Sequence, residues 1–241
     1  MTTRRRLGCV GLVMLLAAGA ASALAFLPTT TRKGVNYRVT ALTIPAYIKT
    51  LDFLQRHYQY QLLVTRICAA TTSDTDCALA LFEWIHTNVR PMPQGWPIID
   101  DHPLHIIIRG YGTSDQAADI FSILAVYAGM PAFFRSLTPD GQLLDLAFVR
   151  LAGRWVPFDV RNHVAFRSRN GALAGIDELV RDPSLVDEQT NGVSPAGVPY
   201  STFISPRVLE PFETPDVLRG ELQQPWPRIR YELRRALGFG T

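Results

Sequence analysis

Ser114 occupies the position in this 241-residue chain that is best suited to nucleophilic chemistry. It follows the stretch Gly110-Tyr111-Gly112-Thr113, whose glycines permit a tight turn with positive φ. Ser114 is expected to cap the helix that begins here, because serine is a favoured N-cap residue. A helix N-terminus carries partial positive charge and is a common place for an activated nucleophile. The stretch therefore predicts a hydroxyl group presented at the positive end of a helix.

One helix and three strands must position this serine. Apolar residues recur at helical spacing over 117–127, and Gly129 with Pro131 marks the end of the helix. Three strand-like segments follow: 132–137, 146–151 and 155–158. Ala152-Gly153 predicts a hairpin turn between the last two strands, and the final strand ends at Asp159. The order is therefore glycine turn, helix, three strands and aspartate.

This order, together with particular residues, resembles the transglutaminase-like (papain-like) core. The matching residues are Gly112, Asp115, Gln116, Ala117, Gly129 to Ala132, Gly153, Trp155, Val156, Pro157 and Asp159. The resemblance covers roughly residues 74 to 162, a little over a third of the chain. It implies an α+β fold in which a central helix packs on a small antiparallel sheet.

The resemblance also implies where a catalytic triad would stand, and two of its three positions have changed. The family's nucleophilic cysteine falls on Ser114, and its histidine, about nine residues before the hairpin glycine, falls on Leu144. Only the triad aspartate is kept, as Asp159. A serine hydroxyl is far less acidic than a thiol, and a helix N-terminus contributes only about 0.3–1 kcal/mol. We therefore expect the inherited cysteine chemistry to be absent.

Two functions follow from these residues, and both stay open here. The first is a non-catalytic domain that binds a peptide or protein partner in the cell envelope. The second is a serine-dependent acyltransferase or amide/ester hydrolase, with Ser114 as nucleophile, Asp159 as orienting acid and His163 or His105 as relocated base. A histidine nitrogen within about 3.5 Å of Ser114 Oγ would favour the second. We favour the first, because the triad position carries Leu144.

No metal or other cofactor is expected. The proline-rich segment 91–105 contains Asp100, Asp101, His102 and His105, but their spacing matches no strong metal-ligand signature.

Residues 1–27 are predicted to be a targeting segment. Arg4-Arg5-Arg6 precedes an uncharged apolar run over 7–27, and Ala21-Ser22-Ala23 and Ala23-Leu24-Ala25 resemble signal-peptidase sites. The run is also long enough to remain as an anchor helix in the inner membrane, since spanning takes about 20 residues. Both alternatives predict export to the periplasm or another extracytoplasmic space, either soluble or anchored.

The charge of the remaining chain bears on whether it binds nucleic acid. The leader holds three arginines and no acid, so the other 21 basic residues balance the 21 acidic ones. A neutral domain gives no support for binding nucleic acid.

Cys68 and Cys77 are the two cysteines outside the leader. In an exported chain such a pair predicts a disulfide, and the alternative is two buried thiols.

The flanking segments divide the chain into four predicted parts. Residues 28–40 are predicted to be a polar linker, 41–170 the transglutaminase-like domain, and 171–241 a loop-rich extension with a terminal helix. That helix, over 228–237, carries Ile229, Leu233 and Leu237 on one side. It is expected either to dock on the domain or to contact a membrane surface or partner.

Overall fold

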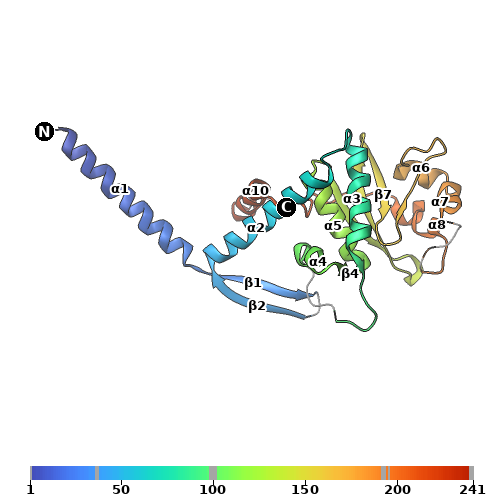
Figure 1. Ribbon diagram of the computed structural model, residues 1–241, viewed down its shortest axis with the longest axis horizontal. Coiled ribbons are helices and arrows are strands. Elements are labelled where there is room, and N and C mark those ends of the chain that lie inside the picture. The colour runs from blue at the N-terminus through green and yellow to red at the C-terminus, as the bar shows by residue number, and fades with distance from the viewer. Residues whose placement is uncertain (1, 36–37, 98–101, 191–193, 195, 239–241) are drawn as a thin grey trace. The chain divides into compact units, whose positions relative to one another are not determined.

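A computed structural model of the chain describes residues 2–35, 38–97, 102–190, 194 and 196–238 (Figure 1). The chain divides into two compact units, residues 1–56 and 57–241. The first unit contains helix α1 (Thr2–Ala25), strands β1 (Pro28–Val35) and β2 (Arg38–Pro45), and the first half of helix α2 (Ala46–Ile67). Within the described part of the chain, no helix combines the length and the apolar composition needed to cross a membrane.

The first unit contains an antiparallel ribbon where the sequence predicted a polar linker over 28–40. β1 pairs with β2 in the register that places Thr29 opposite Ile44. Thr29 also donates a side-chain hydrogen bond to the Ile44 carbonyl oxygen, at 3.1 Å. The run of β-branched threonines in this segment favours an extended strand.

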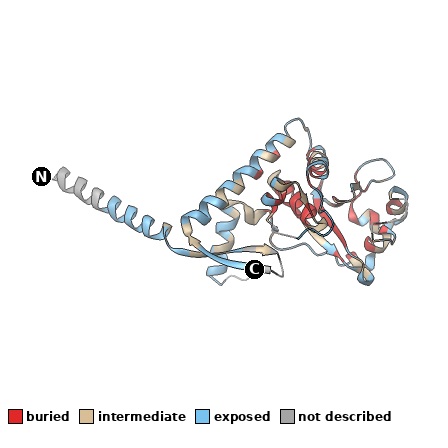
Figure 2. Cartoon of the chain, turned by 60° about the horizontal axis from the view of Figure 1, so that its bottom comes forward, coloured by how far each residue is buried: buried red, intermediate tan, exposed pale blue. Residues whose placement is uncertain are grey.

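The second unit is built on a four-stranded antiparallel sheet, with strands in the order β5-β6-β7-β8. The strands are β5 (Ala132–Leu137), β6 (Leu144–Leu151), β7 (Arg154–Asp159) and β8 (Val164–Ala165). Helix α5 (Ser114–Tyr127) packs against β5 and β6. Most buried residues gather in this unit, as Figure 2 shows. The predicted α+β fold, a central helix on a small antiparallel sheet, is therefore confirmed.

Strand β6 separates two hydrophobic cores because successive side chains point to opposite faces of a sheet. Ala147 and Val149 lie in the core that contains α5, whereas Leu146 and Phe148 lie in the core on the other face. α5 itself is buried almost throughout, from Gln116 to Val126. The alternation along β6 decides which of its residues can face the start of α5.

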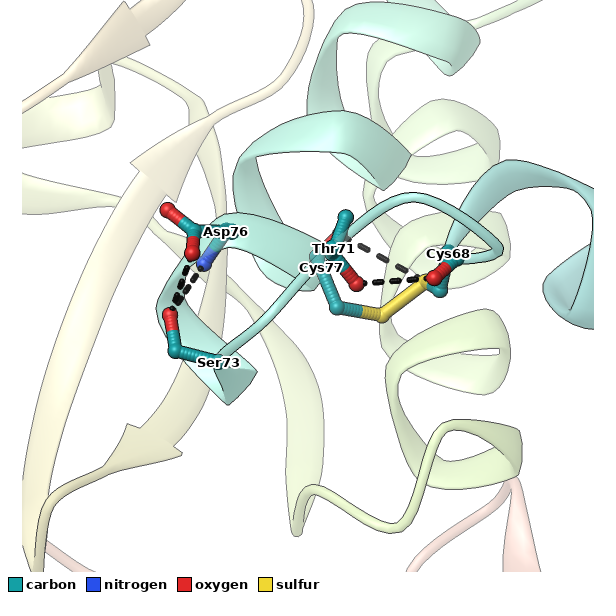
Figure 3. The surroundings of a disulfide bond; sticks show 5 residues. All are labelled: Cys68, Thr71, Ser73, Asp76 and Cys77. Carbon is teal, nitrogen blue, oxygen red and sulfur yellow. Dashed lines mark hydrogen bonds between the residues drawn. A yellow bond between two sulfur atoms is a disulfide. The ribbon is translucent and has the colours of Figure 1, made fainter.

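A disulfide joins the end of α2 to helix α3 (Asp74–Asn88), as Figure 3 shows. The Cα atoms of Cys68 and Cys77 are 5.0 Å apart, within the range that a disulfide requires. Ser73 is the N-cap of α3 and accepts a hydrogen bond from the backbone N–H of Asp76, at 3.1 Å. The predicted disulfide is confirmed.

The segment before α5 contains helix α4, which the sequence did not predict. α4 (Pro103–Arg109) ends at Gly110, which adopts φ 74°. Strand β4 (Tyr111–Gly112) then pairs in parallel with β3 (Arg90–Pro91). This short pairing fixes the chain immediately before Ser114.

The C-terminal part, predicted to be a loop-rich extension with a terminal helix, contains several short helices. They are α6 (Ile176–Arg181), α7 (Ser184–Gln189), α8 (Tyr200–Phe203), α9 (Pro206–Leu209) and the 3-10 turn η2 (Glu221–Gln223), followed by α10 (Pro225–Ala236). A further 3-10 turn, η1 (Pro139–Gly141), follows β5. Tyr200, Phe203 and Leu209 are buried in the same core as Leu146 and Phe148. This segment therefore completes the core on that face of the sheet.

Candidate functional site

The start of α5 is stabilised by Thr113 rather than by Ser114. Thr113 has extended backbone angles, is the N-cap residue, and forms a capping box with Gln116. The backbone N–H of Thr113 donates to Gln116 Oε1 at 3.1 Å. Ser114 is the first residue inside the helix, so the prediction that it caps the helix was wrong. Its hydroxyl is consequently available for another partner.

Gly112 is needed for packing rather than for its backbone angle. A Cβ atom at this position would lie 2.9 Å from Ile106 Cγ2 and 3.0 Å from Gln116 Oε1. Gly110, in contrast, has the positive φ that the sequence predicted for the turn. The two glycines therefore serve different purposes, and together they bring α4 close to the start of α5.

The hydroxyl of Ser114 donates a hydrogen bond to Asp145 Oδ2. Asp145 is the second residue of β6 and is only 3% exposed. The residue that faces Ser114 from β6 is therefore Asp145, whereas Leu144 packs in the core on the opposite face of the sheet. Counting residues back from the hairpin glycine placed the family's histidine on Leu144, but the alternation of β6 directs the next side chain to the serine.

The other oxygen of Asp145 is also occupied. Ser136, which lies opposite Asp145 in the β5–β6 ladder, donates its hydroxyl to Oδ1. Two serines from different elements thus hold one buried carboxylate. A hydrogen bond to a charged group contributes about 1.5–3 kcal/mol, so this arrangement stabilises the contact between α5, β5 and β6.

Asp159, at the end of β7, is fully buried and accepts hydrogen bonds from the backbone N–H of Asn162 at 2.9 Å, from Asn162 Nδ2 at 2.7 Å and from the Tyr200 hydroxyl at 2.7 Å. Burial raises the pKa of the Asp159 carboxyl above its usual value, and the donors from Asn162 and Tyr200 oppose that shift. One of these donors is therefore a backbone amide, that of Asn162. The Arg161 guanidinium donates to the Gly112 carbonyl oxygen at 2.8 Å.

Ser114 and Asp159 line one cavity of about 330 Å³. The other lining residues are Met92, Thr113, Leu143, Leu144, Asp145, Arg161 and Asn162. Ser114 and Asp159 therefore share one cavity. Leu144 contributes to the wall of this cavity although it belongs to the core on the opposite face of the sheet, where Leu146 is fully buried. A larger cavity, of about 450 Å³, has a different lining that includes Arg90, Trp96 and Tyr111.

The structure does not bring His163, the candidate relocated base, together with Ser114. His163 Nε2 lies 2.7 Å from Glu83 Oε1, and the His163 ring stacks on His86 with ring centroids 4.0 Å apart. Burial and the neighbouring His163 lower the pKa of His86. His163 is absent from the residues that line the Ser114 cavity in the described part of the chain.

The ring of His105, the other candidate base, lies 5.3 Å from that of His102, between centroids. Asp100 and Asp101 lie outside the described residues. Among the residues that are described, no group of three or more histidine, cysteine or acidic side chains is arranged to hold a metal ion.

Comparison with known proteins returns matches only among solved structures. No protein-family model and no curated protein matches the chain. The structure of a "putative cysteine protease" from Cytophaga hutchinsonii aligns with a TM-score of 0.39 and 18% identity, over 48% of this chain and 40% of that one. A "putative protease" from Parabacteroides distasonis aligns with a TM-score of 0.37 and 12% identity, over 54% and 35%. A "TGase" aligns with a TM-score of 0.36 and 14% identity, over 58% and 45%.

The chain thus covers less than half the length of each of these three structures.

Proposed function

We propose that this chain is a non-catalytic transglutaminase-like domain that binds a peptide or protein partner in the cell envelope, through the cavity beside Ser114. The observation that carries this proposal is the hydrogen bond from Ser114 to Asp145. Ser114, at the nucleophile position, donates its hydroxyl hydrogen to the buried carboxylate of Asp145. That carboxylate also accepts a hydrogen bond from Ser136. This is a closed structural arrangement in which neither group needs a substrate to be satisfied.

The pairing of a serine with a carboxylate supports the absence of nucleophilic catalysis. A serine nucleophile requires a general base to take its proton, and in a triad the imidazole does so while the acid orients it. A carboxyl group is a weaker base than an imidazole by about 2.6 pKa units in model peptides. Hydrogen bonds given to a carboxylate also stabilise its charge and oppose proton uptake.

Asp159, which would orient the histidine in a triad, likewise has other hydrogen-bond partners. Asp159 accepts hydrogen bonds from Asn162 and from Tyr200, which reaches it from α8. A buried carboxylate without partners would be costly, so these donors stabilise the fold without any triad. Ser114 and Asp159 therefore both have structural partners of their own.

The cavity has the dimensions and lining of a modest binding site. Its volume of about 330 Å³ is near the lower end for ligand pockets, and its wall mixes hydroxyl, carboxylate and guanidinium groups with apolar side chains. Leu143, at this wall, is 57% exposed, and an exposed apolar residue beside a polar cavity suits contact with a peptide side chain. Location in the envelope is supported by the disulfide and by the predicted leader.

The catalytic alternative is tested with a fluorophosphonate probe, which forms an adduct with activated serine nucleophiles. We expect the intact mass of the wild-type chain to show no adduct beyond that of the Ser114→Ala variant. An adduct that is present in the wild type, maps to Ser114 and is lost in the variant would refute the non-catalytic proposal.

Binding is tested by placing a photo-cross-linking amino acid at Leu143 in cells that make the protein. Leu62, on α2 and 55% exposed, is the matched control, because it is equally accessible but does not line the cavity. We expect a discrete adduct from position 143 only. The purified partner should then bind the wild-type chain by calorimetry, and Leu143→Glu should weaken that binding at least tenfold while Leu62→Glu leaves it unchanged. Equal effects at the two positions would refute binding through this cavity.

A further inference from the structure

Helix α10 presents a continuous apolar face to solvent within the unit formed by residues 57–241. Trp226, Ile229, Leu233 and the adjoining Leu237 are spaced three or four residues apart, which places them on one side of a helix. Their exposed fractions are 76%, 49%, 57% and 69%. A monomeric domain seldom leaves so many large apolar side chains exposed in one stripe. Some surface outside this unit is therefore needed to cover the face.

The charges on α10 indicate what kind of surface that is. Residues 225–237 hold four arginines and one glutamate. Glu232 pairs with Arg228 at 2.7 Å and lies 3.9 Å from Arg235. Arg230 and Arg234 form no ion pair within the described part of the chain, and they flank the apolar stripe on one side of the helix. A covering surface that is apolar inside and negatively charged at its edge would satisfy both features.

Two other surfaces that could cover the apolar face of α10 fit these charges poorly. Residues 1–56 carry eight lysines and arginines against one acidic residue, Asp52, so the first unit would bring further positive charge to α10. A second copy of α10 would bring its own unpaired arginines against Arg230 and Arg234. Like charges at close range are unfavourable, and neither arrangement supplies the missing anions.

We propose that α10 lies in the surface of an anionic lipid bilayer, with its apolar stripe inserted at the boundary between headgroups and acyl chains. A helix with arginines on one side and tryptophan and leucine on the other has the composition of such interfacial helices. Trp226 then sits at headgroup depth, where the amphipathic indole ring is favoured. Arg230 and Arg234 contact lipid phosphates from the edge of the stripe. This docking is independent of the leader and of the Ser114 cavity.

Quenching of Trp226 by brominated lipid tests the proposal on the full chain. The probe is a vesicle of equal parts phosphatidylglycerol and bromine-labelled phosphatidylcholine. The spectrum of Trp226→Phe is subtracted from that of the wild type, which leaves the fluorescence of Trp226 alone. The three other tryptophans and any membrane contact of the leader are the same in both proteins. We expect the difference spectrum between wild type and Trp226→Phe to be strongly quenched on anionic vesicles, and weakly on neutral vesicles or at high salt.

Substitutions on α10 should weaken this quenching by predictable factors. Leu233→Glu should raise the lipid concentration needed for half-maximal quenching by about tenfold or more, because one buried leucine is lost. Replacing Arg230 and Arg234 with glutamine should raise it about fivefold for each arginine. Ile108→Glu is the matched control, since Ile108 is 73% exposed on α4 and the change in charge is the same. Circular dichroism checks that each variant remains folded.

The proposal is overturned if the difference spectrum is unquenched on anionic vesicles, as it would be if residues 1–56 or a second copy cover α10. It is also overturned if Ile108→Glu is as damaging as Leu233→Glu. Should Leu233→Glu fail to fold, the arginine pair decides, because glutamine leaves the apolar stripe unchanged and must still lower the affinity.

Discussion

Introducing a cysteine–histidine pair would distinguish Asp145 from Leu144 as the position that faces residue 114. The double variant Ser114→Cys with Asp145→His should yield a thiol that hydrogen-bonds an imidazole, because Asp145 already contacts the side chain at position 114. The matched variant Ser114→Cys with Leu144→His carries the same two residue types. Its imidazole, however, begins on the opposite face of β6. The two proteins differ only in which neighbour becomes histidine.

The size of the effect follows from the population of thiolate. A thiol with a pKa of about 8.5 is only about 1% thiolate at pH 6.5, whereas a thiol lowered to about 6.5 by an imidazole is about half thiolate. That gain of about 50-fold is offset by a lower intrinsic nucleophilicity, about eightfold for two pKa units. The net expectation is an alkylation rate about six times faster at pH 6.5 for the Asp145→His protein. The midpoint of its rate–pH profile should also lie about two units lower.

The assay is iodoacetamide alkylation across a pH series, with peptide mapping to isolate position 114. The wild-type chain gives the background from its other cysteines, and Ser114→Cys alone gives the midpoint of a thiol beside the Asp145 carboxylate. If Leu144→His shifts the midpoint and Asp145→His does not, the face assignment of β6 is wrong. If neither shifts it while both proteins remain folded, the cavity does not hold the two side chains in contact.

Three further predictions concern stability. Ser114→Ala should lower the free energy of unfolding by about 1.5–3 kcal/mol in urea denaturation, because it removes a hydrogen bond to a buried carboxylate. Thr113→Ala should lower it by about 1 kcal/mol, because the N-cap of α5 is lost. Equal losses for the two variants would contradict the assigned partners. Opening the Cys68–Cys77 disulfide should cost at most about 3 kcal/mol, since the closed loop is short, and titration of the untreated protein should find neither thiol free. The pKa of His86 is lowered by burial, so the unfolded state binds more protons below about pH 6.5 and stability should fall on acidification; His86→Gln should reduce this slope, and an unchanged slope would contradict it.

The sequence predicted the centre of the second unit well. α5 and the three strands were placed to within about two residues, because apolar periodicity and glycine turns are local signals. The sequence did not predict the contact between Ser114 and Asp145, because a motif spacing counts along the chain and does not determine which face of a strand each residue occupies. β6 begins at Leu144 rather than at 146, and only with that start does the alternation place Asp145 beside Ser114.

The contacts that the sequence could not predict are long-range or depend on short elements. Tyr200 reaches Asp159 across 41 residues, and its segment carries no periodic pattern that would mark it as part of the core. α4 is only seven residues long, too short for helical periodicity to stand out in a proline-rich segment. Local propensity is a weak guide where tertiary packing supplies most of the stability.

The hydrogen bonds that close the second unit also set a time order for its folding during synthesis. Asp159 obtains its Tyr200 donor only after the ribosome has added 41 further residues, and the Tyr127 hydroxyl finds the Gln223 carbonyl oxygen after 96. Synthesis adds about 5–20 residues per second. For several seconds the nascent sheet therefore lacks one donor to the Asp159 carboxylate and part of the core on one face. The unit can therefore reach its native state only after Gln223 has been added, and a chaperone has that interval in which to hold it unfolded.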